Sequence, residues 1–392
     1  MKAIVRTLVI LCVVLAPAVV SAQDTATMQT EEIFNARVTE VLEQKSAFRD
    51  DGSTSLQQKL KLKGLEGQWK DKEIVFDGTE FDVLSAAEYR VGDKVLVNYT
   101  TGAEGEEKYY VVDFSRTIPL FWLAALFAVI VVAVGRLKGL RALIVLVLTF
   151  VIILKFIVPK IVSGNDPLIT SIIGSFIILI ISVYVTEGLK RTSTIAVASI
   201  SISLVITGAL SIWFTAITRL TGFASEEAMY LIGLAGGTLN IKGLLLAGII
   251  IGTLGVLDDA IIAQVALVKE LKKANPGLSN GQVYTRAMRV GTSHLSSMVN
   301  TLFLAYAGAS LPLLILFSIN QPPFMTFSQV VDNEMIATEI VRTLTGSIGL
   351  VLAVPIATLL AVRYIRFPGR TQKKTPQAPS QLPDKSSTTR GY

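Results

Sequence analysis

The chain has 392 residues, of which 51% are hydrophobic and only 17% are charged, and its formal net charge is +6. A soluble globular domain is normally about 25% charged, so this composition argues against one. The charges are also divided unevenly: residues 23–116 hold 19 acidic and 12 basic side chains, whereas the rest of the chain is basic and apolar. An acidic N-terminal region followed by a basic, apolar region indicates a protein whose two parts lie in different compartments. The distribution does not indicate a protein that binds nucleic acid.

Residues 1–22 have the pattern of a secretory signal peptide. Lys2 and Arg6 form its charged start, an apolar run follows, and the small residues Ser21 and Ala22 precede a cut at Gln23. If the segment is retained as an anchor, the next domain lies on the same side of the membrane. Cys12, the only cysteine, lies inside the apolar run, so a cleaved chain has no thiol chemistry.

Residues 23–116 are polar and contain short strand-like runs. They predict a small, mainly β extracytoplasmic domain, with a barrel as one arrangement. Because this region has no His and no Cys, we expect no transition-metal site in it. The predicted strands, two of which follow glycine-containing turns, are Phe34–Leu42, Glu73–Phe76, Lys94–Tyr99 and Lys108–Phe114.

Residues 117–365 predict an α-helical polytopic membrane bundle of about seven transmembrane helices. Each apolar run is close to the ~20 residues that a helix needs to cross the hydrocarbon of a bilayer. Residues 225–237 are apolar but too short to span, which predicts an interfacial helix or a re-entrant turn. The seven predicted spans are Ile118–Val134, Ala142–Val158, Leu168–Thr186, Thr194–Phe214, Gly243–Val265, Leu295–Ile319 and Ala337–Val362.

The basic residues orient these spans. With the N-terminal domain outside, the segments expected in the cytoplasm hold seventeen Lys and Arg, whereas those expected outside hold few, among them Lys160 and Arg219. An odd number of spans preserves this bias, which is the main reason for predicting seven. The localisation expected is therefore a bacterial plasma (inner) membrane. Residues 366–392 form a basic tail that we expect to be disordered in the cytoplasm or in contact with anionic lipid.

The fifth predicted span contains two adjacent carboxylates, Asp258 and Asp259. A charge at membrane depth costs ~2.5–3.5 kcal/mol on insertion scales, so it usually faces protein or water. Asp259 shares a helical stripe with small residues, which predicts close helix packing around it, and Asp258 lies about 100° away on the helical wheel. The other members of the stripe are Gly248, Gly252, Gly255, Ala263 and Ala266.

The sixth predicted span begins with polar residues at a depth similar to that of the two acids. We expect these groups to meet Asp258 and Asp259 in a cluster suited to handling protons or cations. Helix packing by the same polar residues is the alternative. The candidates for binding an ion or a substrate are Asp258, Asp259, Gln264, His294, Ser297, Asn300 and Thr301.

The segment from Gly255 to Gln264, the preceding Gly236-Gly237 and the run from Gly291 to Thr301 resemble the YibE/F-like membrane proteins of bacteria. The resemblance extends over about residues 30–365, and its most specific part is the Leu257-Asp258-Asp259 motif. It implies a membrane-spanning architecture and a role in transport. It does not supply a substrate.

Three classes of function compete for this sequence. The first is a secondary transporter or permease, coupled to protons or another ion, for an unknown small solute or cation. The second is a membrane-anchored sensor or accessory subunit that binds a ligand or partner through the outer domain. An intramembrane aspartyl enzyme ranks last, because two adjacent residues of one helix cannot face each other, and we expect no enzyme, cofactor or metal. We also expect contact with the lipid bilayer and a homo-oligomer.

Overall fold

The computed structural model describes residues 32–48, 54–80, 88–101, 106–224, 226–234, 239–319 and 325–365. The chain divides into two compact units, residues 1–136 and residues 137–392. The predicted signal peptide, Cys12 and the basic tail lie outside the described residues.

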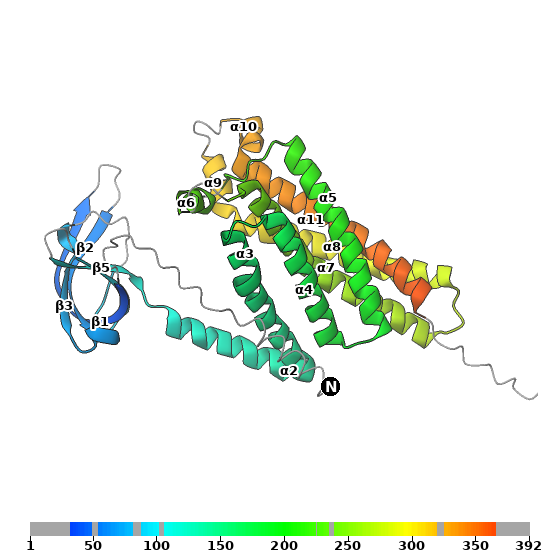
Figure 1. The fold of residues 1–392 in the computed structure, drawn as a ribbon, viewed down its shortest axis with the longest axis horizontal. Helices are drawn as coiled ribbons and strands as arrows, with labels where there is room; N and C mark the ends of the chain where they lie inside the picture. Colours follow the sequence, from blue (N-terminus) through cyan, green and yellow to red (C-terminus); the bar gives the residue numbers. More distant parts are fainter. Residues whose placement is uncertain are drawn as a thin grey trace, which may run out of the picture. The chain divides into compact units, whose positions relative to one another are not determined.

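The first unit contains one antiparallel sheet, in which the strands follow the order β3-β2-β1-β4-β5 (Figure 1). The mainly β prediction is thus confirmed, and the strand β2 is added to the four predicted ones. Two short 3-10 helices, Gly67–Trp69 and Gly78–Glu80, flank β3. The strands are β1 (Glu32–Phe48), β2 (Thr54–Gly64), β3 (Glu73–Asp77), β4 (Lys94–Thr101) and β5 (Glu107–Phe114).

Alternation along the strands builds the core of this sheet. Phe34, Ala36 and Val38 of β1 are buried, as are Leu60 and Leu62 of β2, because successive side chains of a strand point to opposite faces. Trp69 closes the core by stacking on Phe34, with ring centroids 5.0 Å apart.

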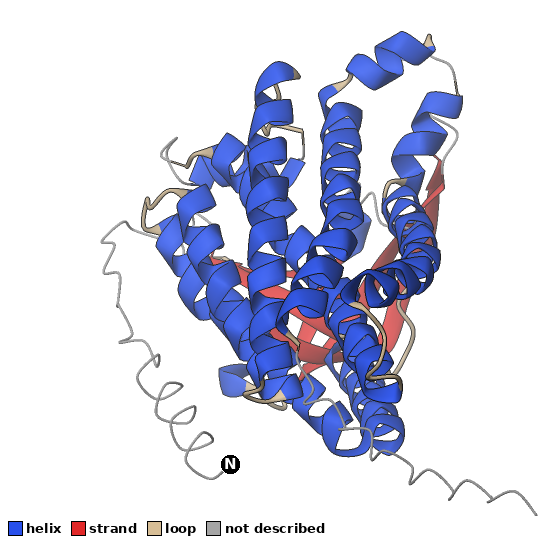
Figure 2. Ribbon diagram, turned by 90° about the vertical axis from the view of Figure 1, so that its right-hand side faces the viewer, coloured by secondary structure: helices blue, strands red, loops and turns tan. Residues whose placement is uncertain are grey.

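The second unit is helical, and outside the sheet the described elements are helices (Figure 2). Its long helices run alongside one another, and the short helices α6, α9 and α10 gather at one end (Figure 1). The helices that begin at or after Thr117 are α2 (Thr117–Ile152), the π-helix η3 (Ile153–Ile157), α3 (Val158–Val162), α4 (Pro167–Glu187), α5 (Arg191–Ile217), α6 (Glu226–Leu234), α7 (Ile241–Ala274), α8 (Asn280–Ala309), α9 (Leu311–Ser318), α10 (Phe327–Asp332) and α11 (Glu334–Tyr364).

Within the described residues, five helical segments are long and apolar enough to cross a membrane, or six if the bent pair α8 and α9 counts as one. The first of the five, Thr117–Val162, is interrupted at Arg136, whose φ of 49° and ψ of −131° are not helical. α8 and α9 meet at an angle of 68°. The sixth predicted span is therefore broken at Ser310, two residues before Pro312.

α7 occupies the centre of the helical unit, where it contacts α4, α5, α8 and α11. Near the C-terminal end of α7, the Lys272 ammonium donates to the carbonyls of Val362 and Ile365 and to the Asn280 side chain. These bonds join the end of α7 to the start of α8 and the end of α11. A cation there also compensates the unpaired carbonyls at the C-terminus of α11.

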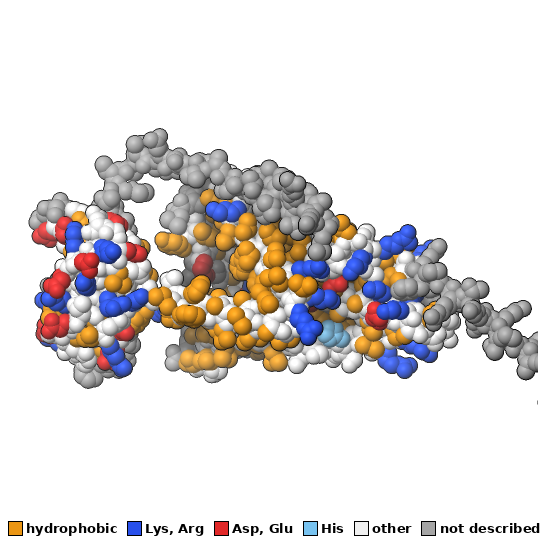
Figure 3. Space-filling view, turned by 90° about the horizontal axis from the view of Figure 1, so that it is seen from below, with side chains coloured by type: hydrophobic (Ala, Val, Ile, Leu, Met, Phe, Trp, Pro, Cys, Tyr) orange, Lys and Arg blue, Asp and Glu red, His pale blue; other side chains and the backbone are white. Residues whose placement is uncertain are grey.

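The surface of the helical unit is apolar along most of its length. Figure 3 shows hydrophobic side chains spread over it and Lys and Arg side chains gathered toward one end. Exposed Val205, Trp213 and Leu359 belong to this apolar surface. Such a surface is stable in lipid and would be a liability in water, so the unit is that of a membrane protein.

Candidate functional site

Asp258 and Asp259 lie in the middle of α7 and point to different surroundings. Asp258 faces α4, where the Ser182 hydroxyl donates to its Oδ2 at 2.6 Å. The other oxygen, Oδ1, is buried and has no hydrogen-bond partner among the described residues. Asp259 is exposed on another face of α7. The two acids are therefore a divergent pair, as the 100° step of a helix requires.

Asp258 also lines a cavity of about 260 Å³ between α2, α4 and α7. Most of the lining is apolar, and its polar groups include Thr149, Ser182 and Asp258. An apolar cavity with few convergent polar groups is a common form of a small binding site. A carboxylate with one bonded and one unpaired oxygen in such a place can take up a proton or a cation.

A row of serines on α4 leads toward this carboxylate. Ser171, Ser175 and Ser182 follow one another at steps of four and seven residues, so they share one helical face. The first two are fully buried, and their hydroxyls have no hydrogen-bond partner within the part of the chain that the structure describes. The row covers eleven residues, or ~16 Å along the helix axis. Successive hydroxyls of the row lie ~6 and ~10 Å apart along the axis, so they do not hydrogen-bond to one another directly.

α5 is also rich in hydroxyls, but four of them, on Ser199, Ser203, Thr207 and Ser211, donate to carbonyls of their own helix. Ser199 donates to the Ile195 carbonyl at 2.7 Å, and Ser203 to the Ser199 carbonyl at 2.9 Å. Such bonds within a helix serve packing, because they leave no free donor. The serine row of α4 was missed, although its spacing is visible in the sequence.

The small-residue stripe around Asp259 lies on an open face of α7. A Cβ built on Gly248 or Gly255 would meet no atom within 4 Å, and one on Gly252 would meet only the Tyr306 hydroxyl, at 4.0 Å. The stripe therefore packs against no helix of the described chain. Its role in helix packing stays a prediction, for which a partner would have to come from elsewhere.

The polar residues of α8 do not join the two acids. His294, Ser297, Asn300 and Thr301 are all exposed. The Thr301 hydroxyl donates to the Ser297 carbonyl of its own helix at 2.9 Å. Within the described residues no hydrogen bond or ion pair connects this set with Asp258, whose partner comes from α4 instead.

Gln264 has a structural position. Its side chain is 4% exposed, and its amide donates to the Thr358 hydroxyl at 2.7 Å and to the Ala287 carbonyl at 3.2 Å. It thus links α7, α8 and α11, with Gly291 leaving room for the amide.

The described residues contain no group of three or more His, Cys, Asp or Glu side chains placed to hold a metal ion.

Comparison with known proteins supports the resemblance in the sequence. Residues 123–366 match the family model described as YibE/F-like protein. No curated protein and no solved structure matches the chain. The match begins within α2 and ends just after α11, so it covers the helical unit with the Asp258 site but not the sheet, which the resemblance had included. Because the match extends over more than half of the sequence, the chain belongs to the YibE/F-like family.

Proposed function

We propose that this protein is a permease of the bacterial plasma membrane that couples the movement of a small solute or cation to a proton or another ion. Asp258 is the coupling group. The observation that carries the proposal is the Asp258 carboxylate, which lines a cavity, accepts from Ser182 with one oxygen and leaves the other buried without a partner in the described chain. An ionisable residue inside a membrane helix is by default a functional candidate.

The topology that accompanies this proposal has seven spans. The interruption at Arg136 divides the first apolar segment into two spans, and α8 with α9 forms one bent span. An odd number puts the sheet outside and the basic tail in the cytoplasm. The gathering of Lys and Arg at one end of the helical unit (Figure 3) supports this orientation. In this orientation residues 366–392 are free to contact anionic lipid of the inner leaflet.

The geometry also changes which acid we expect to matter more. The sequence predicted close helix packing around Asp259, which would make it the shielded acid of the two. Asp258 has the partner, the cavity and the serine row, whereas Asp259 lies on an open face. The divergence of the two side chains also disfavours an aspartyl enzyme, in which two carboxyls must share one site, so we propose a non-enzymatic function.

The test is ion-coupled flux in proteoliposomes that contain a pH-sensitive dye, screened over cations and small metabolites with and without a pH gradient. We expect Asp258→Asn to lower coupled flux by an order of magnitude or more, since an amide of the same shape cannot exchange a proton. Asp259→Asn, at the next residue of the same helix, is the matched control and should retain most of the flux. Ser182→Ala should fall between them.

Two results would overturn the proposal. One is full coupled flux in Asp258→Asn with an unchanged melting temperature. The other is the absence of coupled flux with every solute tested in the wild type.

A sensor or accessory subunit is the second candidate, and the separate compact sheet unit favours it. In that case the sheet would bind a ligand or partner, and Asp258→Asn would leave this binding and the cellular response unchanged.

A further inference from the structure

A second cavity, of about 470 Å³, lies at the end of the helical unit where α6 and α9 gather. Its walls come from α7, α9 and α11, and Ala228 of α6, Ala309 at the end of α8 and the segment before α6 complete the lining. The volume is in the range of ligand sites for small molecules, ~300–1,000 Å³. It is separate from the Asp258 cavity, and the two share no lining residue.

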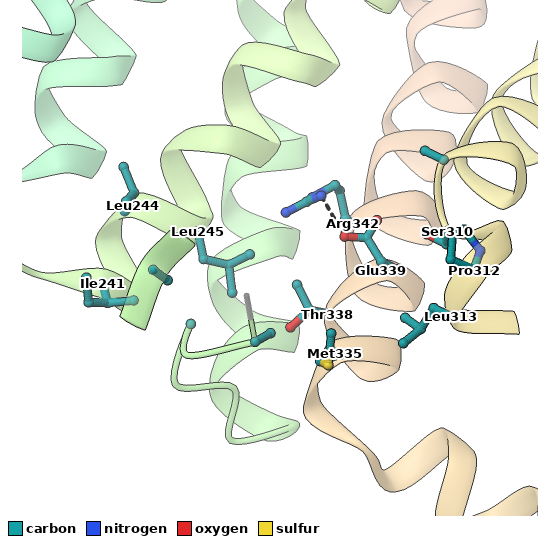
Figure 4. Close-up of a pocket in the computed structure, with 14 residues that line it drawn as sticks. Ile241, Leu244, Leu245, Ser310, Pro312, Leu313, Met335, Thr338, Glu339 and Arg342 are labelled. Atoms are coloured by element: carbon teal, nitrogen blue, oxygen red, sulfur yellow. Dashed lines mark hydrogen bonds and ion pairs between the residues drawn. The ribbon is translucent and has the colours of Figure 1, made fainter. Parts of the chain in front are cut away.

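The charged side chains that line this second cavity both come from α11. On α11, the Arg342 guanidinium donates through Nη1 to Glu339 Oε1 at 2.7 Å, as the spacing of three residues predicts (Figure 4). The two side chains are 32% and 27% exposed, so they form a pair inside the cavity wall and not on an open surface. Arg342 lies eight residues into α11, or ~12 Å along its axis, where an ionisable group usually has a function.

Two further polar atoms in the same wall lack partners. Thr338 is only 4% exposed, and its hydroxyl has no hydrogen-bond partner in the described part of the chain. The same holds for Nε of Arg342. Figure 4 shows both side chains with Glu339 along one side of the cavity, and Leu245 across from them. Buried donors without acceptors are rare in native structures, and a bound acceptor is one explanation for them.

Apart from Ser310, the remaining side chains of the lining are apolar. Leu244 and Leu245 of α7, Leu313 of α9 and Met335 of α11 surround the polar groups. The loop that carries Gly222 closes one side and is held by Glu334, which accepts from the Thr221 and Gly222 amides at 2.7 and 2.9 Å. The cavity is thus a preformed space with an apolar body and one polar wall.

We propose that this cavity binds a small zwitterion with an apolar substituent, such as an apolar amino acid. Its carboxylate accepts from Nε of Arg342 and from the Thr338 hydroxyl, its ammonium group faces Glu339, and its substituent lies against the leucines. Because the Glu339–Arg342 pair is already neutral, a ligand without net charge keeps the desolvated site neutral, whereas a simple anion or cation does not. This site goes beyond the proposed ion coupling and does not depend on it.

The experiment is equilibrium binding by calorimetry to the full-length purified protein in detergent, without any gradient. The probes are glycine, L-alanine, L-leucine and L-phenylalanine, together with N-acetyl-L-leucine and L-leucinamide, each of which lacks one of the two charges. We expect L-leucine or L-phenylalanine to bind more tightly than glycine, and each blocked analogue to bind at least tenfold more weakly than L-leucine.

Variants connect this binding to the cavity. Thr338→Val should weaken L-leucine binding about fivefold to tenfold, since it removes one hydrogen bond. Thr345→Val is its matched control, because this threonine is also buried on α11 but donates to the Val341 carbonyl at 2.7 Å and does not line the cavity. Arg342→Gln should abolish binding.

The inference fails if none of the four amino acids binds the wild type, or if N-acetyl-L-leucine binds as tightly as L-leucine. It fails as well if Thr338→Val and Thr345→Val bind L-leucine equally well. These outcomes are independent of flux, so they separate a failure of this site from a failure of the coupling role of Asp258.

Discussion

Gly349 of α11 is the position at which a single methyl group should disturb the helical unit most. A Cβ built there would lie 1.9 Å from the Thr207 hydroxyl oxygen of α5 and 3.0 Å from the Thr207 Cβ. Thr207 is 1% exposed, and its hydroxyl donates to the Ser203 carbonyl at 2.8 Å, so the side chain cannot turn away without breaking this bond.

Gly349→Ala therefore has two outcomes, and both cost stability. Either α5 and α11 separate by more than an ångström, which is overpacking at about 1–3 kcal/mol, or Thr207 turns away and loses its bond at about 1–3 kcal/mol. We expect a loss of about 2–3 kcal/mol. With about 2–4 °C per kcal/mol for a chain of this size, the apparent melting temperature should fall by roughly 5–10 °C.

The assay is tryptophan fluorescence during heating of the purified protein in detergent, at one fixed scan rate because unfolding of such proteins is often irreversible. Gly248→Ala is the matched control: it places the same methyl group on α7 with no atom within 4 Å, and should leave the melting temperature unchanged or slightly raised. Thr207→Ala should recover part of the loss in the Gly349→Ala background. Equal melting temperatures for the two glycine variants would refute the reasoning.

Three further predictions follow from other parts of the chain. In the sheet unit, the hydrogen bond from Lys59 holds the pKa of Asp77 at about 2, below its unfolded value, so this carboxylate stabilises the fold above about pH 4 and stops doing so as the pH falls toward 2. Expressed alone, the sheet unit should melt cooperatively with a strand-type circular dichroism spectrum, and Asp77→Asn should flatten the fall in its melting temperature between pH 4 and 2; an unchanged pH profile would contradict the assignment. Gln264→Leu should cost about 1 kcal/mol by removing the link between three helices, and a raised melting temperature in detergent would exclude that role. Cysteines introduced at Ser53 and Ser380 should differ in labelling by an impermeant thiol reagent on intact cells, with only position 53 labelled, and the reverse pattern would overturn the orientation.

The periodicity of apolar residues in the sequence predicted most of the strands and helices, but not all of their boundaries. Four strands and the apolar helices follow from it directly. β2 was missed although residues 59–63 alternate Lys and Leu, and Leu60 and Leu62 are fully buried. The lysines at alternate positions of β2 suggest a solvated segment unless the leucines between them are recognised as the buried face of the strand. The bend at Ser310 was also missed, since an apolar run does not reveal where its helix changes direction.

The candidate site shows a more general limit. Helical spacing fixed correctly that Asp258 and Asp259 point in different directions, because that depends on α7 alone. Which neighbour each acid meets depends on the packing of α4, α8 and α11, and no spacing within one helix contains it. The sequence therefore assigned Asp259 to a tight interface and the α8 hydroxyls to the acids, whereas the structure places Ser182 of α4 on Asp258.

Gly255 lies between the cavity that Asp258 lines and the open face of α7 that carries Asp259. It lines the Asp258 cavity and is itself exposed, so the cavity reaches the open face of α7 at this residue. Asp259 lies four residues further along the helix and therefore directly beside that opening. The serine row of α4 approaches Asp258 from the other end of the bundle. The two adjacent carboxylates thus have different surroundings, one enclosed and one open, and the same divergence prevents them from acting as a catalytic dyad.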